Sequence, residues 1–254
     1  MNNTDIRDVE ICYDPASPIP VRTAAQRLAG WLTAKTGILL PIREAAVADG
    51  ARIPTGRFQI WLGTLDQTPV REMVEARHLP GAVRSDGYVL ALVDRRLLIY
   101  SREPRGVIYG CSYALPRRTR LEHHRLYFDF ETIIEEPLDD LRVMSFWGSD
   151  YSFLPQAVCQ FRMNAAWMES KVSGQAYLAD EPALQLYIAP HAEEISRERA
   201  LTAEGIALAK AYGMDAYPGS INSLWQLPPY LYQALARVYP ETIATGYMGG
   251  SEWT

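Results

Sequence analysis

The first 136 residues mix short apolar runs with segments in which apolar residues recur at helical spacing. Short apolar runs bounded by polar turns predict strands. Two of the runs flank Asp94-Arg95-Arg96, and this arrangement predicts a β-hairpin. The strands predicted in this way are residues 6–13, 58–62, 88–93, 97–101, 121–126 and 127–134.

Apolar residues three or four positions apart predict helices between these strands. The first helix begins at Pro20, because proline suits a first helical turn, and it ends at Gly37, where a left-handed residue is favoured. Two more helices begin at Thr68-Pro69 and at Pro104, the second with an apolar stretch at residues 107–115. The apolar positions of the first helix are Val21, Ala24, Ala25, Leu28, Trp31 and Leu32.

The pattern changes after an acidic linker that contains a proline, residues 135–140. Strands and helices then alternate, which indicates a parallel sheet, either doubly wound or closed as a barrel. A long loop is predicted at residues 171–192. The predicted strands are residues 141–147, 165–168 and 214–218. The predicted helices carry Leu154, Ala157, Val158 and Phe161 on one face, then Leu201, Leu208, Ala209 and Tyr212 before Gly213, and finally residues 228–238.

We therefore expect an α/β fold with two domains. Residues 1–136 would form an α+β sandwich domain, and residues 137–254 an incomplete parallel (β/α) barrel segment with about three βα units. A closed eight-stranded barrel needs roughly 250 residues, so the sequence predicts a barrel that stops less than halfway round.

Composition fits a globular protein and argues against a basic nucleic-acid-binding face. The chain has 254 residues, of which 48% are hydrophobic and 22% charged. It has 25 Lys and Arg residues and 30 Asp and Glu residues, which gives a net charge of −5. Binding to nucleic-acid phosphates requires clustered basic residues, so no nucleic-acid partner is expected.

The amino-terminal residues and the cysteines indicate in which cellular compartment the protein is expected. Acidic residues stand where a signal peptide would be basic, and no run approaches 18 apolar residues. We expect no membrane span and no signal peptide, in a cytoplasmic protein or in one whose leader has been removed. Cys12, Cys111 and Cys159 are far apart and have apolar neighbours, which predicts buried free thiols.

Candidate chemistry lies at the carboxyl ends of the predicted parallel strands, where barrel enzymes carry their sites. Asp150 and Glu169 could form a catalytic carboxylate pair if the first two strands are adjacent, or could be solvated loop residues. Asn222 could bind sugar hydroxyls or cap a turn. Aromatic residues near these ends could stack on sugar rings or pack in the core. They are Trp147, Trp167, Tyr217 and Trp225.

Other chemistries find no support in the sequence. It has no phosphate-binding loop, no GxGxxG and no HExxH motif. The segment Gly110-Cys111-Ser112-Tyr113-Ala114 departs from GxSxG at its last position and falls within a predicted helix. The histidines lack metal-ligand spacing. We therefore expect neither a cofactor nor a metal.

An ordered set of motifs resembles glycoside hydrolases. Asp86-Gly87-Tyr88-Val89-Leu90, the hairpin and Arg105-Gly106-Val107-Ile108-Tyr109-Gly110 resemble the accessory domain that precedes the barrel in family 20 hexosaminidases, family 67 α-glucuronidases and their relatives. Three later segments resemble sequences that precede barrel strands or follow a barrel helix in these enzymes. They are Phe161-Arg162-Met163-Asn164, Ala211-Tyr212-Gly213-Met214, and Tyr239-Pro240-Glu241 followed by Gly249-Gly250.

The resemblance implies roles for two residues. Arg142 stands where a family 20 arginine at the first barrel strand holds sugar hydroxyls. Gly249-Gly250-Ser251-Glu252 is similar to the segment that carries the family 20 acid, so Glu252 is a candidate acid, with a loop after Pro240-Glu241 as the alternative.

The resemblance also implies a function. The chain would be the N-terminal portion of a carbohydrate-active glycoside hydrolase, inactive by itself and bound to carbohydrate. The alternative is a non-catalytic carbohydrate-binding or interaction protein on the same scaffold. An unpaired strand edge of an incomplete barrel would favour self-association.

Overall fold

The computed structural model describes residues 2–45, 56–81, 84, 86–147, 150–169, 181–218 and 229–242. Residue contacts divide the chain into two compact units. The first unit comprises residues 1–144, 152–166 and 208–216, and the second comprises residues 145–151, 167–207 and 217–254.

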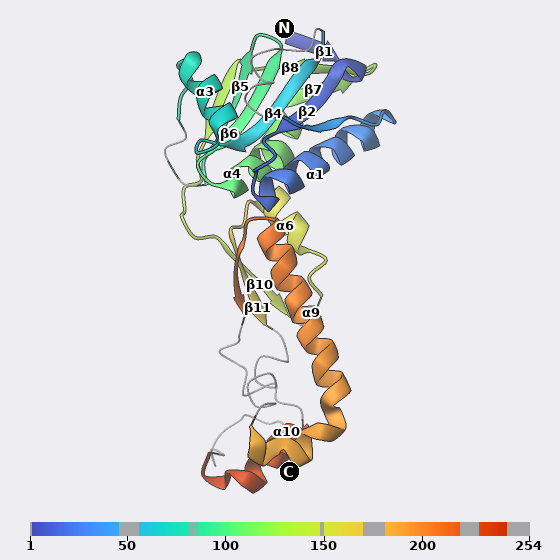
Figure 1. The fold of residues 1–254 in the computed structure, drawn as a ribbon, viewed down its shortest axis with the longest axis vertical. Coiled ribbons are helices and arrows are strands. Elements are labelled where there is room, and N and C mark those ends of the chain that lie inside the picture. The colour runs from blue at the N-terminus through green and yellow to red at the C-terminus, as the bar shows by residue number, and fades with distance from the viewer. Residues whose placement is uncertain are drawn as a thin grey trace. The chain divides into compact units, whose positions relative to one another are not determined.

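A six-stranded sheet forms the centre of the first unit, in the order β3-β2-β4-β6-β5-β9 (Figure 1). β2 is parallel to β3 and β4, and β4 is parallel to β6, while β5 is antiparallel to both β6 and β9. The bounds are β2 Val9–Tyr13, β3 Ile42–Glu44, β4 Phe58–Thr64, β5 Tyr88–Val93, β6 Arg96–Ser101 and β9 Thr132–Glu135.

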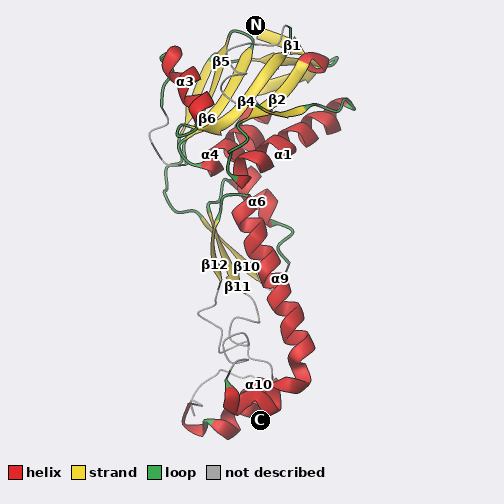
Figure 2. Cartoon of the chain, viewed as in Figure 1, coloured by secondary structure: helices red, strands yellow, loops and turns green. Residues whose placement is uncertain are grey.

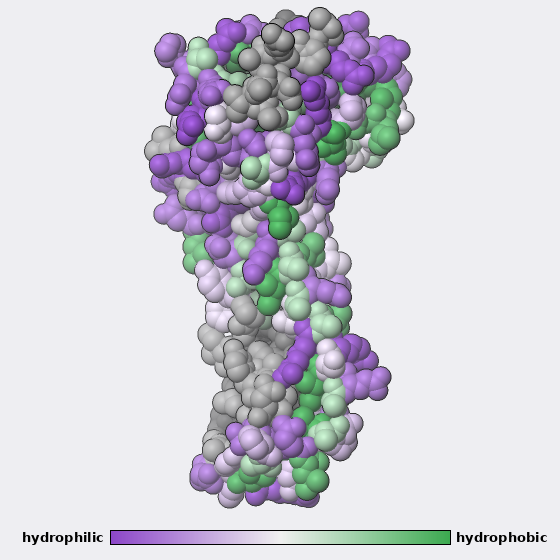
Figure 3. Space-filling model, in the orientation of Figure 1, coloured by the Kyte–Doolittle hydropathy of each residue, from purple (hydrophilic) through white to green (hydrophobic). Residues whose placement is uncertain are grey.

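Helices cover both faces of this sheet (Figure 2). α1 (Ile19–Thr36) and α4 (Pro104–Tyr109) contact each other and β4. α3 (Thr68–Ala76) covers the other face, where Val70 and Val74 pack on Trp61. Every residue of β4 is buried, as expected for a strand covered on both sides. Consistent with this apolar interior, the surface of the first unit that is visible in Figure 3 is largely hydrophilic.

Sequence signals explain the ends of these elements. Gly37 caps α1 with a φ of 72°, the left-handed conformation that the sequence predicts there. After α4 the chain continues through a π-helical turn, η2 (Gly110–Ala114), into α5 (Leu115–Arg118). Gly106 is required at the start of α4, since a side chain there would lie 2.8 Å from the Gly87 carbonyl oxygen.

The predicted strands at residues 6–13, 121–126 and 127–134 are wrong in their limits. Residues 6–8 form a 3₁₀ turn, η1 (Ile6–Asp8), before β2. His123 and His124 have positive φ values of 48° and 62° and form a tight turn that the sequence pattern does not reveal. This turn joins β7 and β8 in a small antiparallel sheet with β1. The bounds are β1 Asn2–Asp5, β7 Thr119–Glu122 and β8 Arg125–Phe128.

A separate three-stranded sheet has the order β10-β11-β12. The Arg142 carbonyl accepts from the Ala165 N–H at 3.2 Å, and the Asn164 carbonyl accepts from the Asp215 N–H at 2.9 Å. The strands therefore begin at the same edge, as parallel strands do. The bounds are β10 Val143–Trp147, β11 Ala165–Glu169 and β12 Asp215–Pro218.

α6 (Leu154–Phe161) connects β10 to β11 and confirms the helix predicted there. Leu154, Ala157 and Val158 are buried. Phe161 is 50% exposed, because the helix ends there and Arg162 turns into the left-handed region.

In the second unit a small helical cluster packs around Leu184, Ile188, Ile195 and Ala234. The loop predicted at residues 171–192 is therefore wrong over its described part, residues 181–192, which is largely helical. Tyr151 packs against Gly205 in α9, where a β-carbon would overlap its ring. The bounds are η3 Pro182–Leu184, α8 Gln185–Ile188, η4 Ala189–His191, α9 Ala192–Ala211, α10 Pro229–Val238 and η5 Pro240–Thr242.

The α/β fold class is confirmed. The division at residue 137 and the incomplete barrel stay predictions. No helix in the described part of the chain has the length and apolar content needed to cross a membrane.

We expect Gly106→Ala to lower the free energy of unfolding by roughly 1–3 kcal/mol, because the new methyl group overlaps Ser101 and the Gly87 carbonyl. Urea denaturation followed by circular dichroism measures this loss. Gly30→Ala is the matched control, since Gly30 lies in α1 with no atom within 4 Å of a new β-carbon. That variant should be about 0.5–1 kcal/mol more stable than the original chain. Equal effects of the two substitutions would contradict the packing argument.

The three cysteines are free and buried, as predicted. Burial raises the pKa of Cys12 to about 12 and also raises the pKa values of Cys111 and Cys159. Because the thiolate is the reactive form, we expect negligible reaction with Ellman's reagent at pH 8 in the native protein. Three thiols per chain should react in denaturant, and rapid reaction of a native thiol would contradict the burial.

Candidate functional site

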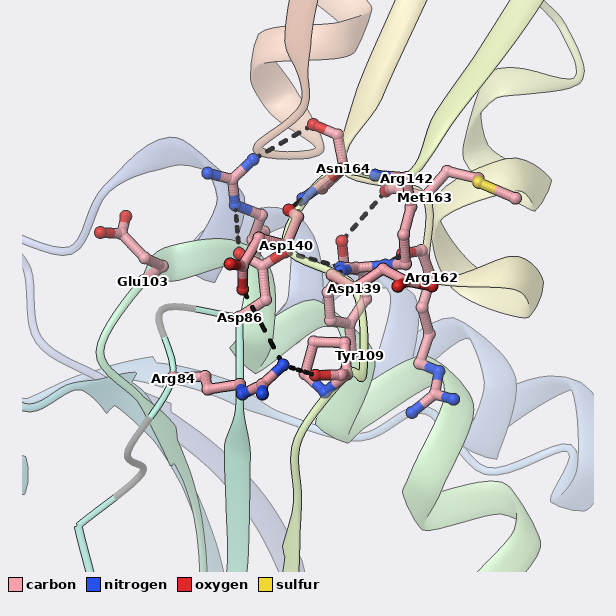
Figure 4. A network of polar contacts seen from close by, with 12 residues as sticks. Arg84, Asp86, Glu103, Tyr109, Asp139, Asp140, Arg142, Arg162, Met163 and Asn164 are labelled. Carbon is pink, nitrogen blue, oxygen red and sulfur yellow. Dashed lines mark hydrogen bonds and ion pairs between the residues drawn. The ribbon is translucent and has the colours of Figure 1, made fainter.

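The Asp86 carboxylate lies in the turn before β5 and is the centre of a buried polar network (Figure 4). Its side chain is only 3% exposed. The Arg105 Nε lies 2.8 Å from Oδ1, while Arg142 Nη2 and Asn164 Nδ2 donate to Oδ2 at 2.6 and 2.9 Å. A buried carboxylate requires such partners, because it loses its hydration.

Arg142 binds three further groups around the start of β10 and β11. Its backbone N–H donates to Asn164 Oδ1 at 2.7 Å. Its side-chain Nε donates to the Arg162 carbonyl at 2.7 Å, and its Nη1 donates to the Asp139 carbonyl. The residue thus ties together the segments that immediately precede the two strands.

Arg105 and Tyr109, on α4, extend the network to β11 and β12. Arg105 Nη1 donates to the Asn164 carbonyl and to Asp215 Oδ2, both at 3.1 Å. The Tyr109 hydroxyl donates to the Met163 carbonyl at 3.0 Å. Burial, reinforced by the negative charge of Asp86, raises the pKa of Tyr109, so the hydroxyl stays protonated and donates.

Glycines bring these side chains together. Gly106 lets the start of α4 lie against the Gly87 carbonyl, which sets Arg105 beside Asp86. Gly213, with a φ of 68°, turns the chain from α9 into β12, and a β-carbon there would lie 2.9 Å from Arg105 Cβ. The two glycines belong to motifs that carry the glycoside hydrolase resemblance, so these motifs form the contact between α4 and the strand beginnings.

The network lies at the amino-terminal ends of β10, β11 and β12. Enzymes with parallel barrels carry out their chemistry at the opposite, carboxyl ends, and conserve the amino-terminal face for stability. Both oxygens of the Asp86 carboxylate moreover lie beside protein cations, Oδ1 beside Arg105 and Oδ2 beside Arg142. The network therefore holds the beginnings of these strands against α4.

The predicted site residues lie in different parts of the chain. Arg142 pairs with a buried carboxylate, Asp86, and its role in sugar binding stays a prediction. Trp167 lies in β11 and Tyr217, 51% exposed, in β12, while Asp150 is exposed before α6. Trp147 and Glu169 are the last residues of β10 and β11. Trp225, Asn222 and Glu252 lie outside the described residues.

Sequence reasoning missed the roles of Asp86, Arg105, Tyr109 and Asn164. The segments that contain them carried the resemblance, but nothing in the pattern paired residues up to 110 positions apart. The charged residues at the edges of apolar segments could have indicated these roles, because such residues need polar partners when the segments pack together.

The first unit also has a cleft of about 310 Å³ beside α3. Trp61, Met73 and Leu98 line it, and the exposed ion pair between Arg77 and Asp94 lies at its rim. None of the predicted site residues borders this cleft. Within the described residues no group of three His, Cys, Asp or Glu side chains could hold a metal ion.

Comparison with known proteins identifies the fold. No protein-family model matches the chain, and no curated protein matches it. The solved structure of a GH138 enzyme targeting pectin rhamnogalacturonan II is similar, with a TM-score of 0.52 and 14% identity over 83% of this chain. CpGH84B and CpGH84D give TM-scores of 0.54 and 0.58, at 14% and 12% identity, over 94% and 95% of this chain.

These similarities establish a glycoside hydrolase-like fold. The matches cover 24%, 39% and 41% of the three solved chains, so this chain spans about a quarter to two fifths of their length. Membership of families 20 or 67 stays a prediction.

We expect Asp86→Asn to lower the free energy of unfolding by roughly 3–5 kcal/mol, because the substitution removes the buried carboxylate that pairs with both arginines. Arg105 would keep only the exposed Asp215 carboxylate, and Arg142 would lose the carboxylate with which it pairs. The matched control is Asp94→Asn, which breaks an ion pair whose side chains are 54% and 59% exposed. It should cost less than about 1 kcal/mol. Urea denaturation compares the two variants, and equal losses would contradict the assignment of Asp86 as the central buried group.

Proposed function

We propose that this chain provides the accessory domain and the first βα units of the catalytic barrel of a glycoside hydrolase. The observation that supports this proposal most strongly is the Asp86 network, which holds the beginnings of three parallel strands against α4. The similarity to glycoside hydrolase structures supports the same assignment.

In this proposal sugar binds at the carboxyl ends of β10, β11 and β12. A regular parallel ladder continued from the bonds at Arg142 and Asn164 sets Trp167 level with Tyr217. Tyr217 is half exposed, and an exposed aromatic ring suits stacking on a sugar. Among the described residues the buried indole N–H of Trp167 has no hydrogen-bond partner, so it is a donor that a sugar oxygen can satisfy.

Hydrolysis of a glycosidic bond requires two carboxyl groups on either side of that bond. Asp150, which precedes α6, and Glu169, which ends β11, are the proposed candidates near these strand ends. Glu252 remains a third candidate. Arg142, held at the opposite end of β10 by Asp86, acts in this proposal as a positioning residue.

The coding DNA beyond Thr254 tests the proposal directly. We expect an open reading frame that supplies five more βα units, with carboxylates after the fourth strand. A stop codon directly after Thr254 would overturn the proposal and favour a non-catalytic carbohydrate-binding protein.

We also expect the purified 254-residue chain to show no turnover on a panel of chromogenic glycosides. The described residues hold three parallel strands of this sheet, whereas a barrel builds its site from the ends of several strands of eight. Light scattering should show self-association, because β10 and β12 are at the edges of the described sheet. Robust turnover by a monomer, abolished by Glu169→Gln or Glu252→Gln, would contradict this expectation.

A further inference from the structure

A second polar cluster of the first unit, which we call the arginine surface, comprises Tyr113, Arg117, Arg118 and Arg162 with Glu135 beside them. The Arg117 guanidinium lies 3.9 Å from the centroid of the Tyr113 ring, and the Arg162 guanidinium lies 4.3 Å from it. Two cations thus share one aromatic ring. Figure 4 shows the Arg162 side chain pointing away from Asp86, so this cluster is separate from the Asp86 network.

The cluster carries an excess of positive charge. Among the described residues Glu135 is the carboxylate within ion-pair distance of Arg118 and Arg162, at 3.5 Å from each. That separation is longer than the 2.7–2.9 Å typical of strong charge-assisted hydrogen bonds. The Tyr88 hydroxyl instead holds Glu135 Oε2 at 2.5 Å. Two guanidinium groups therefore share one carboxylate at long distance, and the third, Arg117, contacts the Tyr113 ring and carbonyl. The cluster thus has three positive charges and one negative charge, in a protein whose net charge is −5.

The arginines are accessible and partly fixed in position. Arg117 is exposed, and the side chains of Arg118 and Arg162 are 55% and 28% exposed. Arg117 Nη1 also donates to the Tyr113 carbonyl at 2.8 Å. The Arg162 guanidinium is held by the Tyr113 ring and by Glu135, so fewer side-chain rotamers must be ordered when a ligand binds.

We propose that the arginine surface binds the carboxylate groups of an acidic polysaccharide, a polymer of uronic acids. The planar guanidinium fork matches a carboxylate, and neighbouring arginines can engage carboxylates repeated along one polymer. The saccharide part of this inference rests on the proposed function, and the carboxylate part rests on the arginine geometry alone.

Calorimetry on the full 254-residue chain tests the proposal with an oligogalacturonate as the probe. Its methyl-esterified form is the matched neutral probe, because it has the same backbone without the charges. We expect the acidic probe to bind and the neutral one not to bind. The Arg117→Gln/Arg118→Gln variant should weaken binding at least about tenfold, because it removes two charged donors that can form hydrogen bonds with carboxylates.

The matched control variant is Arg7→Gln/Arg125→Gln, which changes the net charge equally at two exposed arginines outside the cluster. It should retain full affinity, and circular dichroism should show both variants folded. Arg162→Lys keeps the charge but removes the fork, and it should weaken binding as well.

Three results would overturn the inference. The first is the absence of binding to the acidic probe, and the second is an equal loss of affinity in the control variant. The third is equally tight binding of polyglutamate, which would indicate an acidic protein segment as the ligand, or of a sulfated oligosaccharide, which would indicate a general anion site. The test is separate from that of the proposed function, because the reading frame beyond Thr254 can support a glycoside hydrolase whether or not uronates bind.

Discussion

The arrangement of this protein depends on one buried carboxylate. Asp86 lies between Arg105 and Arg142 and also accepts from Asn164, so a group that is costly to bury alone is compensated on both oxygens. Apolar packing buries one face of each helix and strand, but it is non-directional and does not fix how these elements are aligned with one another. The network supplies directional contacts between α4 and the beginnings of β10 and β11, because its donors belong to these segments.

This constraint acts at one end of the three parallel strands. The six-stranded sheet and the amino-terminal strand ends are held rigidly, and under the proposed function the carboxyl ends would carry the sugar-binding loops, as in parallel barrels generally. The glycine motifs that resemble those of glycoside hydrolases lie at the rigid end. They help to hold the strands and carry no information about a substrate, and similarity to solved structures at 12–14% identity likewise shows the fold alone.

The sequence predicts elements well where the signal is local. Pro20 and Gly37 locate α1, and the apolar runs around Asp94 locate the β5-β6 hairpin, because caps and alternation act over a few residues. It fails where the outcome depends on tertiary context. The His123-His124 turn adopts a conformation usually left to glycine and asparagine, and the Asp86 partners are separated by as many as 78 residues. No periodicity encodes such a pairing.

Whether Asp86 holds the strand beginnings can be measured by hydrogen exchange and mass spectrometry of the Asp86→Asn chain. We expect much faster exchange at the amides of Arg142, Ala165 and Asp215, whose acceptors lie in or beside the network, while the amides between β4 and β6 remain protected. Unchanged protection at the beginnings of β10, β11 and β12 would mean that these strands are held without Asp86, and that the network does not have the role assigned to it.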